Sequence, residues 1–122
     1  MKKLISIIIP MYNEEESLPY LYDRLTKLAD KIENYNMEFL FVNDGSKDNS
    51  LNIVKEYKKS DERVCYLNLS RNFGKEVAMA AALDYVRGDV VAIIDADLQD
   101  PPELIIDMLK YYEEGYDDVY AK

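Results

Sequence analysis

The sequence lacks histidine and tryptophan and has only one cysteine among its 122 residues. A single cysteine cannot form a disulfide within the chain, and Cys65 lies in the apolar run VCYLNL. We therefore interpret it as a small buried side chain rather than a reactive thiol. This cysteine usage fits a reducing compartment.

Long hydrophobic runs are also absent, and none approaches the roughly 20 residues that span a bilayer. The apolar start MKKLISIIIP is short and is followed by acidic residues instead of a small-residue cleavage site. This order argues against a signal peptide. Together these absences predict a soluble, cytoplasmic chain.

Basic residues are outnumbered, with 15 Lys and Arg against 24 Asp and Glu and a net charge of −9. This balance argues against binding to nucleic acid or to an anionic membrane by electrostatic attraction alone. To bind phosphate groups, such an acidic chain needs a few well-placed basic residues or a metal ion. The hydrophobic share of 48% argues against disorder, and the length suits one domain with a real core.

Four short runs rich in β-branched or aromatic residues predict strands that are buried on both faces. They are LISIII at 4–9, MEFLFV at 37–42, VCYLNL at 64–69 and VVAII at 90–94. All four are too short to be read as helices, and apolar residues at helical spacing lie between them. The chain therefore alternates between strand and helix.

The helices are predicted from apolar spacing and from their end signals. They lie at about 18–32, at 51–57 after a candidate cap, Asp48, at about 73–86 before Gly88, and after Pro101 and Pro102. Strands that alternate with helices predict an α/β fold, a Rossmann-like parallel sheet with helices on both faces. Ligands of such sheets bind beyond the carboxyl ends of the strands.

A polar loop follows each predicted strand. The loops read PMYNEEE, NDGSKDNS, SRNFGKE and DADLQD. Because the carboxyl ends of parallel strands meet at one edge of the sheet, we expect these loops to converge on one rim. This rim is the candidate site.

The last of these loops concentrates acidic residues. Asp95 and Asp97 point the same way on an extended chain, with Cα atoms roughly 6–7 Å apart. Two carboxylates at that spacing repel by about 2–3 kcal/mol, which a bound divalent cation would remove. Mg²⁺ or Mn²⁺ prefers such oxygen ligands, and Gln99 lies on the same side. The alternative is a solvated loop, and for Asp100 we favour a role as cap of the next helix.

Other loop residues allow two interpretations each. Asp44 either accepts a hydrogen bond from a nucleobase or bonds its own turn, in which Gly45 is free to take a positive φ. Arg71 and Lys75 either face diphosphate oxygens or lie plainly on the surface. The Gly-Lys pair at Lys75 is not a P-loop, because the upstream glycine is missing and Glu76 replaces the Ser or Thr.

The first loop offers a tyrosine and a run of acids. Tyr12 is placed to flank a base, and Glu14 or Glu15 to accept hydrogen bonds from ribose hydroxyls. The alternative is that these acids favour the positive end of the following helix. Spacing alone leaves both interpretations open.

Taken together, the segments SIIIPMYNEEESL, FLFVNDGSKDNS, LSRNFGKEVAMAAALDYVRGD and IIDADLQDPPELI resemble the amino-terminal half of a family 2 glycosyltransferase with the GT-A fold. The similarity runs from about residue 5 to 122 and is greatest to the polyprenyl-phosphate and dolichol-phosphate sugar transferases. The DAD triplet corresponds to the DxD signature of that family. The resemblance implies an inverting enzyme that uses a UDP-sugar or GDP-mannose with Mg²⁺ or Mn²⁺.

The resemblance also assigns roles to individual residues. The nucleoside positions are Pro10, Tyr12, Glu14 and Asp44. The positions around the metal and diphosphate are Asp95, Asp97 and Gln99. Arg71 and Lys75 stay candidates for the donor diphosphate from their place in the third loop alone. Asn43 departs from the pattern, because relatives often carry an aspartate there.

The resemblance further implies that residues 1–122 are the nucleotide-sugar-binding part of a longer domain. We expect the acceptor-side strands and the catalytic base beyond residue 122, a lipid-phosphate acceptor, and a parent enzyme at the cytoplasmic face of the membrane in cell-envelope glycan synthesis. We expect little activity from this part alone. An exposed sheet edge near Val119 predicts some self-association.

Three other protein classes share some of these sequence features. A receiver domain needs a phosphoacceptor aspartate after its third strand, where this chain has Leu69 and Ser70. A haloacid-dehalogenase-type phosphatase places Asp-x-Asp after its first strand, whereas Asp95 follows the fourth. A nucleotide-binding module without catalysis, or an assembly fragment, remains the stronger alternative.

Overall fold

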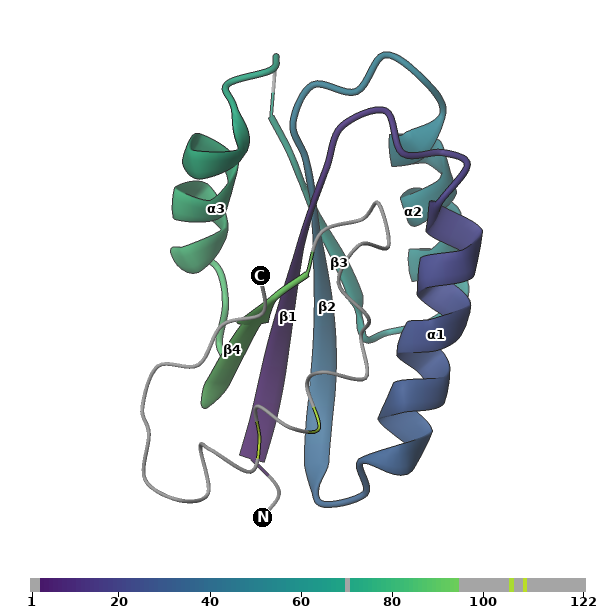
Figure 1. The fold of residues 1–122 in the computed structure, drawn as a ribbon, viewed down its shortest axis with the longest axis vertical. Coiled ribbons are helices and arrows are strands. Elements are labelled where there is room, and N and C mark those ends of the chain that lie inside the picture. The colour runs from purple at the N-terminus through teal and green to yellow at the C-terminus, as the bar shows by residue number, and fades with distance from the viewer. Residues whose placement is uncertain (1–2, 70, 95–105, 107–108, 110–122) are drawn as a thin grey trace.

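A computed structural model of the chain describes residues 3–69, 71–94, 106 and 109. Its elements are β1 (Lys3–Met11), α1 (Leu18–Lys31), β2 (Tyr35–Asn43), α2 (Ser50–Ser60), β3 (Val64–Asn68), α3 (Lys75–Leu83) and β4 (Val90–Ile93). The strands form a parallel sheet in the order β3-β2-β1-β4. Helices α1 and α2 cover one face and α3 the other (Figure 1). The predicted α/β fold is confirmed.

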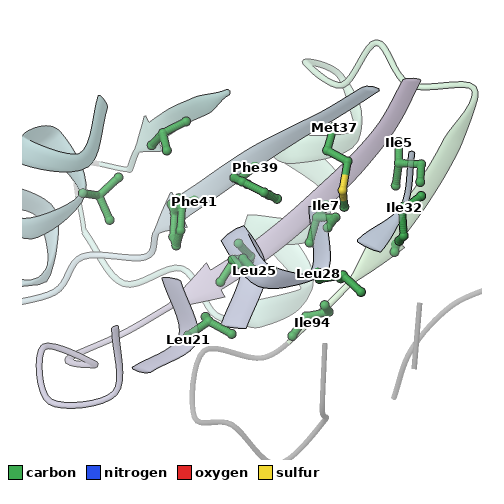
Figure 2. Close-up of a cluster of buried hydrophobic side chains, with 14 of the residues drawn as sticks. Ile5, Ile7, Leu21, Leu25, Leu28, Ile32, Met37, Phe39, Phe41 and Ile94 are labelled. Atoms are coloured by element: carbon green, nitrogen blue, oxygen red, sulfur yellow. The ribbon is translucent and has the colours of Figure 1, made fainter. Parts of the chain in front are cut away.

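The larger core lies between the sheet and helices α1 and α2. Alternate residues of β1 and β2 point to this face and meet the apolar stripe of α1, as the helical spacing predicts. Each such side chain contributes about 1.5–3 kcal/mol when fully buried. Figure 2 shows members of this cluster, among them Ile5, Ile7, Leu21, Leu25, Leu28, Phe39, Phe41 and Ile94.

A smaller cluster lies on the opposite face, under α3. Its buried members are Ile8, Leu40, Val42, Ala78, Ala82 and Ile93. Cys65 is free and half-buried and packs against this cluster, so it is less buried than expected. No helix in the described part of the chain is long and apolar enough to cross a membrane.

The prediction that all four strands are buried on both faces is wrong for β3. Val64 is buried, but Tyr66 is 37% exposed, and burial varies along the strand. The reason is position, because β3 is an edge strand of the sheet and pairs only with β2 among the described strands. An apolar run in the sequence does not reveal whether its strand is central or at the edge.

The predicted third helix, at 73–86, is too long at both ends. Gly74 has φ +97°, which is not helical, so α3 begins at Lys75. At the other end the buried carboxylate of Glu38 accepts hydrogen bonds from the Ser6 hydroxyl and from the backbone N–H of Arg87 (3.1 Å). Ser6 Oγ also accepts from Gly88 N (2.8 Å), and these bonds hold the chain against the sheet after the helix ends.

The start of α2 differs from its prediction, and the predicted fourth helix is described only in part. Asp48 does not occupy the cap position of α2, which is Asn49, although Asp48 Oδ1 accepts a hydrogen bond from Ser50 N (3.0 Å) at the start of the helix. Of the predicted fourth helix, only Ile106 and Leu109 are described, and both are helical. Its other residues, the predicted cap Asp100 and the predicted edge near residue 119 lie outside the described residues.

An ion pair between Asp61 and Arg63 lies just before β3, and a hydrogen bond joins it to α1. Asp61 accepts hydrogen bonds from Arg63 Nε (2.9 Å), Arg63 Nη2 (3.0 Å) and the hydroxyl of Tyr22 (2.6 Å). The bond from Arg63 is the main reason why the pKa of Asp61 falls to about 2, against the opposing effect of burial. Burial and the bond to Asp61 raise the pKa of Tyr22 to about 12.

The depressed pKa of Asp61 predicts acid destabilisation. The ionised carboxylate stabilises the fold fully above its unfolded pKa of 3.8, and this stabilisation is lost as the pH falls through the folded value of about 2. We expect a loss of about 2 kcal/mol from this group between pH 6 and pH 2. Urea unfolding at both pH values measures it, with Asp61→Asn as the control. An equal acid effect in the wild type and in Asp61→Asn would contradict this assignment.

Candidate functional site

The carboxyl ends of three strands lie in one row. Met11 at the end of β1 pairs with Asn43 at the end of β2, which pairs in turn with Asn68 at the end of β3. The loops that follow these strands therefore leave the sheet at the same level. Three of the four predicted polar loops converge as expected, and the fourth lies outside the described residues.

The β1–α1 loop is bonded to the β2–α2 loop along its length. Three successive backbone N–H groups of the first loop each donate to a side chain of the second loop or of the first residue of α2. The pairs are Asn13 N to Ser46 Oγ (2.9 Å), Glu14 N to Ser50 Oγ (2.9 Å) and Glu15 N to Asp48 Oδ2 (3.2 Å). These bonds hold the two loops together as one wall.

Asn13 completes this wall. Its φ of +54° lies in the left-handed region, which asparagine tolerates better than most residues. Its side-chain oxygen accepts a hydrogen bond from Lys47 N (2.8 Å). Asn13 thus bonds the β2–α2 loop with both its backbone and its side chain.

The carboxylate of Asp48 is held in its ionised form. Burial alone would raise its pKa, but hydrogen bonds from the Ser50 hydroxyl (2.6 Å) and from the backbone N–H groups of Ser50 and Glu15 outweigh burial and lower it. The negative charge stabilises this loop junction at neutral pH.

The β2–α2 loop also contacts the β3–α3 loop. Asp44 is 5% exposed, and its two carboxylate oxygens accept hydrogen bonds from Phe73 N (2.8 Å) and Gly74 N (3.0 Å). Gly45 has φ +74° and lies so close to the third loop that a Cβ atom would be 2.5 Å from the carbonyl carbon of Arg71. A side chain has no room there.

These three loops enclose a pocket of about 700 Å³. Amide, hydroxyl and charged groups dominate its wall. The lining residues are Tyr12, Asn43, Gly45, Ser46, Lys47, Asp48, Leu51, Asn52, Asn68, Leu69, Arg71 and Asn72. A concave site with several convergent polar groups is what a small polar ligand requires.

Only some of the predicted site residues line the pocket. Tyr12, 41% exposed, and Arg71 line the pocket. The Arg71 guanidinium lies 4.9 Å from the ring centre of Phe73. Asp44 lies behind the wall rather than in it, because its oxygens bond the β3–α3 loop.

Pro10 and Glu14 do not line the pocket. Pro10 is buried within β1, which continues to Met11 and so extends beyond the predicted strand end. Its position suits a residue without an N–H group, because β4 pairs with β1 only at 5–8. Glu14 borders a separate, smaller hollow of about 310 Å³ with Glu15, Glu16, Ser17 and Asp48, among others.

The side chains of the remaining predicted residues lie outside what the structure describes. Lys75 is the first residue of α3, but its side chain is not among the described ones. The predicted metal ligands Asp95, Asp97 and Gln99 follow Ile94 in sequence and are not described. Within the described part of the chain, no three His, Cys, Asp or Glu side chains are grouped to hold a metal ion.

Sequence reasoning missed several residues that build the pocket. Asn13, Ser46 and Ser50 join the first two loops, and Asn68 ends β3 in the pocket wall. The sequence signal that could have pointed to these residues is a small polar residue directly after an apolar run. Their partners lie 25 to 36 residues away, so spacing could not pair them.

Comparison with known proteins identifies the family. The model of the family described as glycosyl transferase family 2 matches residues 6–122. The chain belongs to glycosyl transferase family 2. The resemblance noted from the loop motifs is confirmed, and the chain is a family 2 glycosyltransferase sequence with the GT-A type of fold.

Two relatives show how much of a family 2 protein this chain covers. It is 49% identical over 116 residues to the "uncharacterized glycosyltransferase YkcC" of Bacillus subtilis, covering 95% of this chain and 36% of that protein. It is 42% identical over 118 residues to the "bactoprenol glucosyl transferase" of Shigella phage SfX, covering 97% of this chain and 38% of that one. The chain thus spans little more than a third of these relatives.

Solved structures agree with the family 2 fold. S. aureus TarS 1-349 in complex with UDP-GlcNAc has a TM-score of 0.68 at 27% identity, covering 93% of this chain and 32% of that one. The mannosyltransferase PcManGT from Pyrobaculum calidifontis, in complex with GDP-Man and Mn²⁺, has a TM-score of 0.71 at 22% identity, covering 87% and 31%. The second likeness shows the fold alone.

Proposed function

We propose that this chain binds the nucleotide of a nucleotide-sugar donor and forms the donor part of an inverting glycosyltransferase. The pocket at the carboxyl ends of β1, β2 and β3 is the observation that carries the proposal. It lies where α/β sheets bind ligands, and its wall offers the amide and hydroxyl groups that a nucleoside needs. The family membership supplies the reaction class.

The proposed donor is a UDP-sugar or GDP-mannose. TarS, at 27% identity, is named in complex with UDP-GlcNAc, which supports a nucleotide sugar as the ligand class. Arg71 lies in the pocket wall, which supports the proposal that its guanidinium donates to diphosphate oxygens. Tyr12 lines the same pocket from the first loop and offers an aromatic face to the base.

The proposed acceptor of the parent enzyme is a polyprenyl phosphate, in the synthesis of cell-envelope glycans. Relatives at 42% identity are named bactoprenol glucosyl transferases, and bactoprenol is a polyprenol. An acceptor of this kind would place the parent enzyme at the cytoplasmic face of the membrane.

The proposed cofactor is Mg²⁺ or Mn²⁺, held by Asp95, Asp97 and Gln99. Carboxylate and amide oxygens are the ligands that these cations prefer. When bound, such a cation stabilises the charge that builds on the departing diphosphate. Within the described pocket, Lys47 and Arg71 are the lining residues that add positive charge for the same group.

Calorimetric titration with UDP and with GDP, each with and without Mn²⁺, tests the proposal. We expect one nucleotide to bind in a Mn²⁺-dependent manner and Asp97→Ala to weaken that binding at least about tenfold. Asp100→Ala is the matched control, because it removes an acid of the same loop that we expect to cap a helix. Absence of binding to a chain that circular dichroism shows to be folded would overturn the proposal.

A further inference from the structure

A pair of asparagines connects the ends of β2 and β3 inside the pocket wall. Asn43 is 3% exposed and its Nδ2 donates to Asn68 Oδ1 at 2.9 Å, while Asn68 itself is exposed at the pocket. The two residues are directly paired in the register of the strands. Each amide has a donor end and an acceptor end, so the orientation of the pair decides what the pocket presents.

A backbone bond fixes that orientation. Ser46 N donates to Asn43 Oδ1 at 3.1 Å, and a backbone N–H group can only donate. The atom that faces Ser46 must therefore be the oxygen of Asn43, which leaves the NH₂ group of Asn43 to face Asn68. Asn68 must in turn present its oxygen to Asn43. Its own NH₂ group is then left for the pocket, and no described residue accepts a hydrogen bond from it.

We propose that Asn68 determines base specificity in the nucleotide pocket by donating a hydrogen bond to a carbonyl oxygen at the edge of the base. Uracil and guanine carry such an oxygen at ring positions 4 and 6, where cytosine and adenine carry an amino group. An amino group facing the Asn68 NH₂ would leave two donors opposed. The pocket therefore takes uridine or guanosine diphosphates, and this inference rests on the proposed function.

Asn43 is the positioning residue for this selection. An aspartate at position 43, as the resemblance leads us to expect in relatives, has no donor at neutral pH. It would turn the Asn68 amide around, and Asn68 would then present an oxygen to the pocket. The asparagine at 43 thus sets the hydrogen-bond polarity of a residue on the neighbouring strand.

Base selectivity of this chain tests the proposal. Calorimetric titration with UDP, CDP, GDP and ADP in the presence of Mn²⁺ gives two ratios, UDP over CDP and GDP over ADP. The wild type is expected to bind one of these two pairs, UDP and CDP or GDP and ADP. Within that pair, we expect the nucleotide whose base carries the carbonyl oxygen to bind about tenfold more tightly or better. Asn68→Asp replaces the donor by an acceptor while still accepting from Asn43 Nδ2, so that ratio should fall to one or below.

Asn52→Asp is the matched control for charge. Asn52 lines the same pocket, and its side chain bonds Asn49 and not Asn43 or Asn68. Its substitution therefore adds the same negative charge and leaves the bond between Asn43 and Asn68 in place. We expect it to weaken all four nucleotides by a common factor and leave the ratios unchanged. If Asn68→Asp does not fold, Asn68→Ala removes the donor without adding charge and should bring the ratio towards one.

Two results would overturn the inference even if the chain binds a nucleotide. One is a wild-type ratio near one, and the other is an unchanged ratio in folded Asn68→Asp or Asn68→Ala. Wild type that binds a nucleotide without selecting the base would leave the proposed function intact and reject only the role of Asn68. Wild type that binds none of the four nucleotides would reject the proposed function, and the inference with it.

Discussion

Replacing Gly45 by alanine is expected to lower the free energy of unfolding by about 2–5 kcal/mol and to abolish measurable nucleotide binding. Two effects add. The φ of +74° strains any residue that has a Cβ atom. The added Cβ would also press on Asn72 N and lie 2.5 Å from the carbonyl carbon of Arg71, and both are backbone atoms that cannot rotate away. The β3–α3 loop would have to move, and with it one wall of the pocket.

Gly74→Ala separates these two effects. Gly74 also has a positive φ, +97°, but a Cβ atom there would meet no described atom within 4 Å. It should cost only backbone strain, about 1–3 kcal/mol. Urea unfolding of both variants and titration of Gly45→Ala with UDP and GDP provide the measurements. A Gly45→Ala protein of wild-type stability would show that the second and third loops do not need this close approach.

Replacing Asp44 by alanine is expected to lower the free energy of unfolding by about 3–5 kcal/mol. The carboxylate is buried and accepts from Phe73 N and Gly74 N. Its removal leaves Phe73 N without this acceptor and leaves Gly74 N with only its second acceptor, Asn72 Oδ1 at 3.0 Å. Hydrogen bonds to a charged group are the stronger kind. Because these donors precede α3, we also expect faster amide hydrogen exchange at the start of that helix.

Asp44→Asn and Asp23→Ala complete the Asp44 experiment. The amide of Asp44→Asn keeps one acceptor oxygen but sets an NH₂ group against the second N–H donor, so we expect an intermediate loss. Asp23→Ala removes an exposed acid that pairs with Lys27 on the surface of α1, at 60% exposure, and should change stability by less than about 0.5 kcal/mol. Equal effects of Asp44→Ala and Asp23→Ala would show that the Asp44 carboxylate does not hold the third loop.

Local sequence patterns were enough to predict the layers of the fold. The runs at 4–9 and 37–42 are so rich in apolar residues that only a doubly covered parallel strand can bury them, and β1 and β2 are such strands. The apolar stripe from Leu18 to Leu28 has helical spacing, which places α1 against the larger core. The prediction that the loops meet at one rim then followed from the rule that the carboxyl ends of parallel strands lie at one edge of the sheet.

The pocket wall was only partly predictable. Tyr12 and Arg71 were found because aromatic and basic side chains stand out in polar loops. Asn13 and Asn68 were not found, because an asparagine in a loop is ordinary until its partner is known. Asp44 was assigned to a ligand or to its own turn, and its described bonds instead reach the third loop.

The sequence by itself determined which segments are strands and helices. The spacing of apolar residues and the residues that begin or end a helix are local properties of the chain. Only the tertiary structure decided that β3 lies at an edge, that α3 ends before its apolar pattern does, and which loop groups are bonded to one another. Glu38 illustrates the reason. It is a charged residue inside an apolar run, and its partners Ser6 and Arg87 lie 32 and 49 residues away. Such partners are brought together by strand order, which no local pattern specifies.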